Sequence, residues 1–160
     1  MSPARIHIDL GRQRLLLETG RRRVTYDVST SMHGAGEKNG SRRTPRGAHV
    51  VRARIGDGAP VGTVFVGRRP TGEICTPELY ATAPERDWIL TRILWLSGSE
   101  PGRNRLGDVD TMRRYIYIHG CPDEAPLGVP GSHGCIRMRS ADLIELFDRV
   151  PVGTPVMIEE

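Results

Sequence analysis

Residues 114–137 read RYIYIHGCPDEAPLGVPGSHGCIR, and this stretch carries most of what the sequence says about the fold. It opens with tyrosines and isoleucines, which are typical of β-strands, so we expect a strand over 114–118 that ends directly on His119. Residues 120–131 contain three prolines and three glycines and should form no regular structure. The loop then returns to the turn around Cys135. We therefore expect a rigid strand end and a returning turn to bring His119 and Cys135 together.

A histidine beside a cysteine suits nucleophilic catalysis. A free thiol has a pKa of about 8.5 and is a weak nucleophile near neutral pH, but an imidazole can take its proton. We predict that Cys135 is the nucleophile and His119 its base. Gly134 would leave room for substrate and leave the backbone N–H groups of residues 134 and 135 free as an oxyanion hole.

The His-Gly-Cys triplet occurs twice, which allows a second interpretation. His119, Cys121, His133 and Cys135 could together form a Cys2His2 zinc site. Structural zinc pairs usually leave two to four residues between ligands, whereas one residue separates each pair here. The spacing therefore favours catalysis over metal binding.

Outside this stretch the sequence predicts one domain over residues 1–160, mainly β with one clear helix. Residues 31–47 are rich in glycine and lack a hydrophobic period, so we expect a long functional loop there. Residues 88–96 fit either a buried strand or a short helix. The helix should run from an N-cap at Ser140 to about residue 150. We expect strands at 5–10, 14–18, 23–29, 48–55, 63–67 and 155–159.

The composition narrows the partners. The net charge is +4, and 22 of the 23 basic residues are arginine, which suits an anionic ligand. The basic residues are scattered and lack interleaved aromatics, so we expect no nucleic acid. No apolar stretch is long enough to cross a membrane, and three cysteines predict reduced thiols rather than disulfides. If Met1 is the native start, we expect a cytoplasmic protein; a longer precursor would place it in the periplasm.

The motif Ser132-His133-Gly134-Cys135-Ile136-Arg137 with the upstream His119-Gly120 resembles the signature of the YkuD-type L,D-transpeptidase family. Thr44-Pro45-Arg46-Gly47 and the ending after the cysteine strengthen the resemblance, which spans roughly residues 5–158. It implies a mainly β catalytic domain with one or two helices, built as a mixed β-sandwich. It also implies peptidoglycan stem peptides or muropeptides as partners and no cofactor or metal.

The resemblance assigns roles to individual residues. It makes Cys135 the nucleophile and His119 the general base, with His133 and Gly134 lining the catalytic site. Arg137 would hold a substrate carboxylate, although a salt bridge bracing the turn is an equally good interpretation. Ser132 would support the turn, and both Ser132 and Gly120 would belong to the substrate-binding residues.

The resemblance also implies a reaction. The cysteine would attack the L-configured carbonyl of the third residue of a tetrapeptide, expel D-alanine and leave a thioester. Release by water would make an L,D-carboxypeptidase of wall recycling, which we favour because no leader segment is evident. Release by an amine would make an L,D-transpeptidase that forms 3-3 cross-links. An inactive peptidoglycan-binding module is a third reading, and the sequence fixes neither the third residue nor the oligomeric state.

One position departs from the family pattern. Cys121 stands where such sequences more usually carry a hydroxyl residue. Because it lies two residues from His119, one interpretation is that oxidation links Cys121 to Cys135 in a reversible disulfide. The interpretation that we favour is a small filler side chain in place of the hydroxyl.

Overall fold

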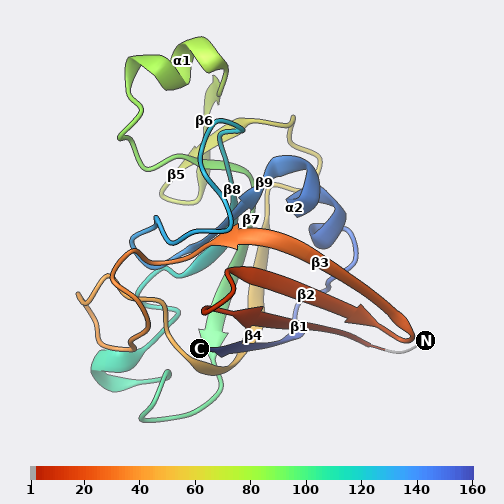
Figure 1. The fold of residues 1–160 in the computed structure, drawn as a ribbon, viewed down its shortest axis with the longest axis vertical. Helices are drawn as coiled ribbons and strands as arrows, with labels where there is room; N and C mark the ends of the chain where they lie inside the picture. The colour runs from red at the N-terminus through yellow and green to blue at the C-terminus, as the bar shows by residue number, and fades with distance from the viewer. Residues whose placement is uncertain (1–2) are drawn as a thin grey trace.

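The computed structural model describes residues 3–160, and one twisted ten-stranded sheet organises them (Figure 1). The strands are β1 Ala4–Asp9, β2 Arg14–Thr19, β3 Arg22–Ser29, β4 Gly47–Ile55, β5 Thr63–Val66, β6 Arg69–Ile74, β7 Ile89–Gly98, β8 Tyr117–Cys121, β9 Ile136–Arg139 and β10 Pro155–Glu159. Two α-helices, α1 Pro77–Thr82 and α2 Ser140–Phe147, and a 3-10 turn at Gly107–Val109 complete the fold.

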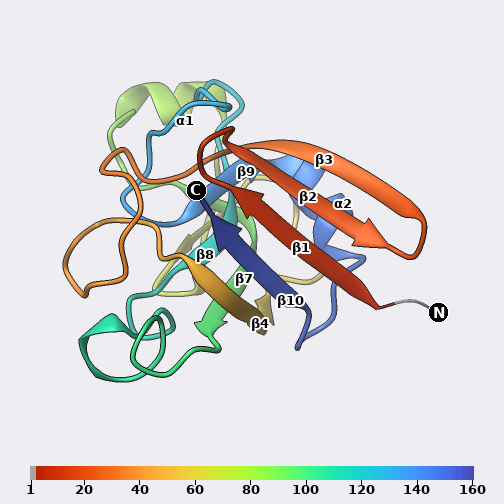
Figure 2. The same ribbon diagram turned by 60° about the horizontal axis from the view of Figure 1, so that its bottom comes forward.

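The sheet closes on itself. Its order is β4-β10-β1-β2-β3-β9-β8-β7-β5-β6, and β4 also pairs with β7. Figure 2 shows β10 alongside β1, with β4 and β7 on its other side. The mainly β class with two helices agrees with the prediction, but the predicted sandwich of two sheets is wrong. The β4–β7 pairing removes the free edges that two separate sheets would need and makes the sheet barrel-like.

The core lies inside this closed sheet and is capped by α2. Alternate residues of β1 and β2, among them Ile8, Leu15 and Leu17, are almost fully buried there, as the period of two requires. Helix α2 packs against β7, β8 and β9 through Leu143 and Phe147. Strands β1 to β3 and β10 thus form the scaffold behind β8, which carries His119, and β9, which begins directly after Cys135.

Several element boundaries differ from expectation. The ambiguous segment 88–96 forms a strand from residue 89 onward, and this strand, β7, pairs with β5 on one side and β8 on the other. Ser140 is the first residue of α2 rather than its N-cap, which is Arg139. The Ser140 hydroxyl instead accepts a hydrogen bond from Thr91 at 2.7 Å in the interior. Three short elements were not predicted from the sequence: β6, α1 and β9, all of which have six residues or fewer.

The expected strand over 114–118 is displaced. Strand β8 begins only at Tyr117, so His119 lies in the middle of the strand and not at its end. Tyr115 has a left-handed φ of 57°, which departs from the extended conformation of a regular strand. Asp110 accepts hydrogen bonds from the backbone N–H groups of Arg113 and Arg114, which hold 110–114 as a turn. His119 is therefore held more rigidly than a residue at a strand end.

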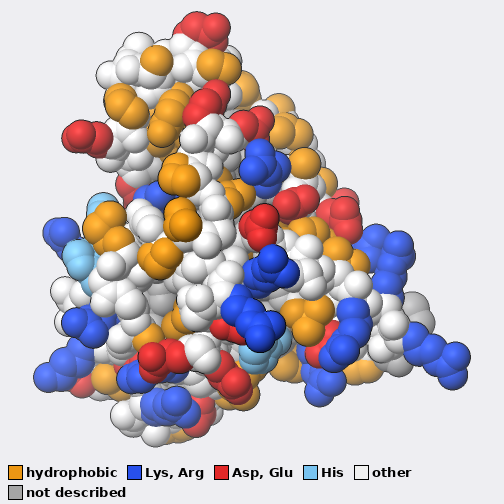
Figure 3. Space-filling model, in the orientation of Figure 1, with side chains coloured by type: hydrophobic (Ala, Val, Ile, Leu, Met, Phe, Trp, Pro, Cys, Tyr) orange, Lys and Arg blue, Asp and Glu red, His pale blue; other side chains and the backbone are white. Residues whose placement is uncertain are grey.

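The helices and the surface charges bear on possible membrane and nucleic-acid partners. Within residues 3–160, no helix combines the length and the hydrophobicity required to cross a bilayer. On the face shown in Figure 3, basic side chains are spread among acidic and apolar ones. The scattered basic residues expected from the sequence are visible there.

Candidate active site

Parallel strands β8 and β9 bring the cysteine motif beside the histidine. His119 pairs with Arg137 and Ile118 pairs with Ile136, so Cys135, just before β9, lies opposite Tyr117. Ile118 and Ile136 face the core, and the alternating residues face a cavity of about 300 Å³ on the other side of the sheet. In this register the Cα atoms of residues 119 and 135 are about 8 Å apart, a diagonal that two side chains can span.

The cavity is lined by residues from four separate segments. His119, His133, Cys135 and Arg137 all contribute to its wall, as does Ser132. The structure thus gathers five of the seven predicted site residues, whereas Gly120 and Gly134 do not line this cavity. Further lining residues, which the sequence analysis missed as site residues, are Arg68, Asp87, Arg114, Tyr115 and Tyr117.

The sulfur of Cys135 is held between two backbone groups. It accepts a hydrogen bond from the Tyr117 N–H at 3.3 Å and donates to the Tyr115 carbonyl at 3.3 Å. Burial raises the pKa of this thiol to about 12, although the Tyr117 N–H and the charges of Arg137 and Arg114 lower it. The resting sulfur is therefore a protonated thiol.

His119 is oriented to act as a base. Its side chain is 1% exposed, and its Nδ1 lies 2.7 Å from the Gly120 carbonyl. Because a carbonyl only accepts, Nδ1 carries the proton and Nε2 is left as the basic nitrogen. Burial lowers the pKa of His119, so the ring is neutral at neutral pH and able to take the thiol proton.

Gly120 supplies this orienting carbonyl in a place that admits no side chain. A Cβ on Gly120 would lie 2.6 Å from the Leu90 carbonyl oxygen and 2.8 Å from the Ser140 hydroxyl. Strand β7 bulges beside it, with a register shift between Leu90 and Ile93 and a φ of 77° at Thr91. The backbone of β7 therefore packs in direct contact with Gly120, the residue whose carbonyl positions His119.

The turn before Cys135 is braced by two hydroxyl groups. Ser132 Oγ donates to the Cys135 carbonyl at 2.6 Å and accepts from the Gly134 N–H at 3.2 Å. Thr44 Oγ1, which is completely buried, donates to the Gly134 carbonyl at 3.0 Å. The Thr44-Pro45-Arg46-Gly47 segment noted in the sequence thus packs against the turn that holds Cys135 and stabilises it through Thr44.

Gly134 is required for a different reason from the one expected. Its φ is 129°, and a Cβ there would point at the Ile116 side chain, 3.2 Å away, rather than toward substrate. Its N–H donates to Ser132, so it is not free to form half of an oxyanion hole as predicted. The glycine is needed for backbone conformation, not for access.

Cys121 lies away from the nucleophile. It pairs with Arg139 on β9, four residues beyond Cys135, which corresponds to about 13 Å along a strand. Its sulfur donates to the Met138 carbonyl at 3.4 Å, and burial raises its pKa to about 11. A disulfide needs Cα atoms within about 7 Å, so the predicted link between Cys121 and Cys135 is wrong.

The four residues of the zinc alternative do not converge. No cluster of three or more potential ligands is present among residues 3–160. His119 and Cys135 face one cavity, whereas Cys121 faces another.

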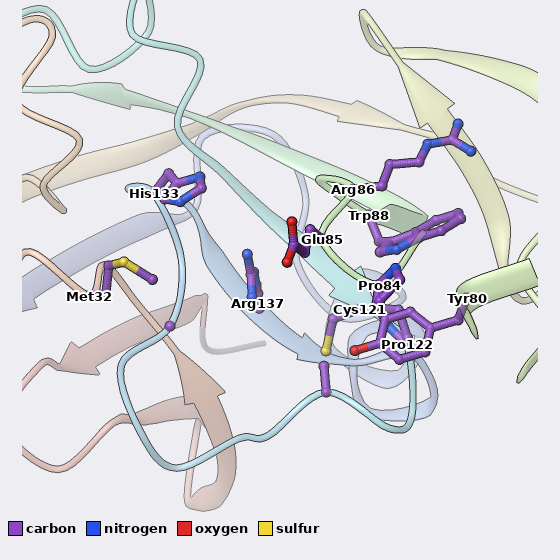
Figure 4. A pocket seen from close by; sticks show the side chains of 12 residues that line it. Met32, Tyr80, Pro84, Glu85, Arg86, Trp88, Cys121, Pro122, His133 and Arg137 are labelled. Carbon is purple, nitrogen blue, oxygen red and sulfur yellow. The ribbon is translucent and has the colours of Figure 1, made fainter. Parts of the chain in front are cut away.

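A second cavity, of about 290 Å³, adjoins the first. His133 and Arg137 line both. Figure 4 shows Arg137 on β9 between His133 and Cys121, with Trp88 and Tyr80 on the opposite side. Arg137 is half-buried and, within residues 3–160, forms no ion pair with any carboxylate. The alternative in which Arg137 braces the turn through a salt bridge is therefore not supported by its contacts.

Comparison with known proteins identifies the family of this chain. The chain belongs to the family of L,D-transpeptidase catalytic domains, whose family model (YkuD) matches residues 3–158. The probable L,D-transpeptidase ErfK/SrfK of Salmonella typhimurium is 49% identical over 131 residues, which cover 71% of this chain and 39% of the relative.

Solved structures show the same fold. The L,D-transpeptidase of Xylanimonas cellulosilytica has a TM-score of 0.56 at 22% identity, covering 99% of this chain and 61% of that one. L,D-transpeptidase 3 of Mycobacterium tuberculosis, in complex with a faropenem-derived adduct, has a TM-score of 0.57 at 16% identity, covering 98% and 60%. The chain spans 14% of the probable L,D-transpeptidase YbiS of Escherichia coli and 39% of the Salmonella relative.

Proposed function

We propose that the protein is a cysteine acyltransferase that cleaves the L,D bond before the terminal D-alanine of peptidoglycan stem tetrapeptides, acting as an L,D-carboxypeptidase. The observation that carries the acyl-transfer chemistry is the pairing of a buried, neutral His119 with a thiol held by two backbone groups in one cavity. Family membership supports the substrate class.

The proposed reaction runs through a thioester. Sγ of Cys135 attacks the L-configured carbonyl carbon while its proton passes to Nε2 of His119. The C–N bond to D-alanine then breaks as His119 returns the proton to the leaving amine. Water attacks the thioester with His119 again as base, and the products are a tripeptide carboxylate and the restored thiol.

The charge of the nucleophile cavity supports water as the acceptor. Three arginines, Arg68, Arg114 and Arg137, line it against one carboxylate, Asp87. A positive potential attracts the carboxylates of a free tetrapeptide and disfavours an incoming ammonium group, while water is unaffected. Muropeptides released during wall recycling are the proposed substrates, and the predicted cytoplasmic location stays a prediction that cell fractionation tests.

The adjoining cavity supports a second candidate function, transpeptidation. It shares Arg137 and His133 with the nucleophile cavity and carries Glu85 on its wall, so a cationic amine could approach the thioester from that side. An amine acceptor would give a 3-3 cross-link or an exchanged D-amino acid.

Product analysis separates the two functions. We expect mass spectrometry of a disaccharide tetrapeptide incubated with the protein to show tripeptide and D-alanine, even when a D-amino acid is present in excess. A dominant exchanged or cross-linked product would contradict the carboxypeptidase and leave the acyl transfer standing.

Two variants test the assigned chemistry. Cys135→Ala should abolish turnover, and His119→Ala should lower it by roughly 100- to 10,000-fold. Cys75→Ala and His7→Ala serve as matched controls because neither side chain lines the nucleophile cavity. Turnover by Cys135→Ala would disprove the proposed function, and near-normal rates in His119→Ala would move the base role to His133.

The role of Arg137 needs a separate variant. Arg137→Lys keeps the charge but loses the bidentate fork, so the KM for tetrapeptide should rise more than the melting temperature falls. A lower melting temperature with an unchanged KM would instead assign Arg137 a bracing role.

A further inference from the structure

Arg68 is one of the three arginines that line the nucleophile cavity. It lies in the turn between β5 and β6, where Val66 pairs with Arg69 and two residues, Gly67 and Arg68, connect the strands. Its side chain reaches back over the cavity that holds Cys135. No motif in the sequence marks this residue.

The guanidinium of Arg68 is held in place by aromatic side chains. Its carbon lies 4.8 Å from the Trp95 ring centroid and 4.9 Å from that of Tyr115. Its Nη1 donates to the Tyr117 hydroxyl at 3.0 Å. Stacking of this kind fixes the plane of the guanidinium and leaves its other N–H groups for a ligand.

The backbone of Arg68 is strained for an arginine. Its φ is 65° and that of Gly67 is 57°, which defines a two-residue hairpin turn with two left-handed positions. Asparagine or glycine is the favoured residue at such a position, and a larger residue costs roughly 1–2 kcal/mol there. Because the left-handed backbone conformation disfavours arginine, its presence at this position points to a role of the side chain beyond forming the turn.

The other arginines of the cavity have different tasks. Arg114 donates to the carbonyls of Gly36 and Arg43 and to the Ser41 hydroxyl, so it is engaged in fixing the 34–47 loop. Arg137 lies two residues after the nucleophile and is the residue expected from the sequence to hold a substrate carboxylate. Arg68 forms no ion pair in the part of the chain that the structure describes, residues 3–160.

Tyr117 sets the spacing between Arg68 and the reaction centre. Its N–H contacts the Cys135 sulfur, and its hydroxyl contacts Arg68 at the other end of the side chain. The carboxylate of the leaving D-alanine lies within one residue of the scissile carbonyl, which is too close to Cys135 for that carboxylate to reach Arg68. A carboxylate at the far end of the third residue's side chain lies about one extended side chain away.

We propose that Arg68 binds this remote carboxylate and selects substrates whose third residue is a diamino dicarboxylic acid over those with a neutral or monocarboxylic side chain. The proposal rests on the proposed function, since it names the substrate class read by the same cavity. Arg68 is in this account a specificity-determining residue, and Trp95, Tyr115 and Tyr117 preorganise it.

The test compares three tetrapeptides that differ by one group. The first has a free remote carboxylate, the second has that carboxylate converted to a carboxamide, and the third has the terminal D-alanine amidated instead. Wild-type kcat/KM should be about 10- to 100-fold higher for the first peptide than for the second, because a charge-assisted bidentate contact is lost. Arg68→Asn suits the turn and should reduce this ratio to about 1.

Matched controls keep the outcomes separate. Arg69→Asn removes an exposed neighbouring charge outside the cavity and should keep the wild-type ratio. Arg68→Asn should lower kcat/KM more for the peptide with the free remote carboxylate than for the remote carboxamide peptide and leave the melting temperature unchanged, whereas a purely structural role would lower the melting temperature and lower all three rates by the same factor.

Three results overturn the proposal. These are an unchanged ratio in Arg68→Asn, a loss of discrimination only against the amidated D-alanine, and a uniform fall in all rates. Equal wild-type turnover of the first two peptides removes the role of Arg68 alone. Absence of turnover with every peptide removes the proposed function with it.

Discussion

Gly120→Ala tests whether the backbone carbonyl beside His119 positions the base. The added methyl group would lie 2.6 Å from the Leu90 carbonyl oxygen and 2.8 Å from Ser140 Oγ, both well inside van der Waals contact. Leu90 belongs to the central strand β7 and cannot yield as a side chain could. The strain should therefore move Gly120 and with it the carbonyl that accepts from Nδ1 of His119.

The magnitude follows from this geometry. Overpacking a well-packed site typically costs about 1–3 kcal/mol of unfolding free energy. Relieving the closest contact requires a shift of about 0.5 Å, and a misplacement of about 1 Å in a catalytic group can cost roughly 100-fold in rate. We expect kcat to fall by about 10- to 100-fold, more than the loss of stability alone accounts for.

The assay combines urea unfolding with tetrapeptide turnover below the unfolding transition. Gly11→Ala is the control, because its Cβ would meet only Asp9 Oδ1 at 3.4 Å and the Glu160 backbone at 3.8 Å, both ordinary van der Waals distances. It should leave both measurements unchanged. A Gly120→Ala protein that is destabilised but retains the wild-type kcat would refute the positioning role of the Gly120 carbonyl.

Three other predictions follow from the buried polar groups. Protonated His119 cannot accept the thiol proton, so kcat/KM should fall as the pH drops through the pKa of His119. Because burial lowers this pKa, the midpoint of that fall should lie below pH 6.5. A midpoint at or above pH 6.5 contradicts this. His49 is 1% exposed and its pKa is lowered to about 4, so the folded protein binds fewer protons than the unfolded chain between about pH 4 and 6.5. Its contribution to unfolding free energy should fall by about 3 kcal/mol as pH drops through that window, and urea titrations of wild type and His49→Gln should differ in this slope. Thr44→Val leaves the Gly134 carbonyl and the Ser31 N–H without their partner and should lower the free energy of unfolding by about 1–3 kcal/mol. Thr44→Ser keeps the hydroxyl and should retain most of that stability. Equal stability of the two variants in urea would show that these hydrogen bonds contribute little.

The sequence predicted the scaffold strands because their patterns are local. Strands β1 to β3 alternate apolar and polar residues between clear turns, and their boundaries match to within one residue. The displaced start of β8 has a tertiary cause, since the left-handed Tyr115 is held by a turn that begins at Asp110. Barrel closure through β4 and β7 is likewise a long-range pairing that no local period encodes.

The candidate site was predictable where a short motif carried it. His119 and Cys135 were found because a thiol and an imidazole stand out chemically, and the parallel pairing of β8 with β9 gathers them. Arg68 was not predicted, because it lies in a two-residue turn about fifty residues before His119. Its proposed role depends on aromatic side chains from β7 and β8, which no local pattern places beside it. The predicted disulfide was wrong because nearness in sequence to His119 did not translate into nearness to Cys135.

The most direct test of the central claim is to trap the acyl-enzyme and locate the acyl group. The protein is mixed with tetrapeptide, or with a carbapenem as a slowly released acyl donor, quenched in acid and mapped by peptide mass spectrometry. The account predicts one adduct, on Cys135, absent from Cys135→Ala and formed slowly by His119→Ala. With tetrapeptide as the donor, at least one D-alanine should be released for each adduct, because every acylation expels one. An adduct on Cys75 or Cys121 with Cys135 unmodified, or release of D-alanine by Cys135→Ala, would contradict it.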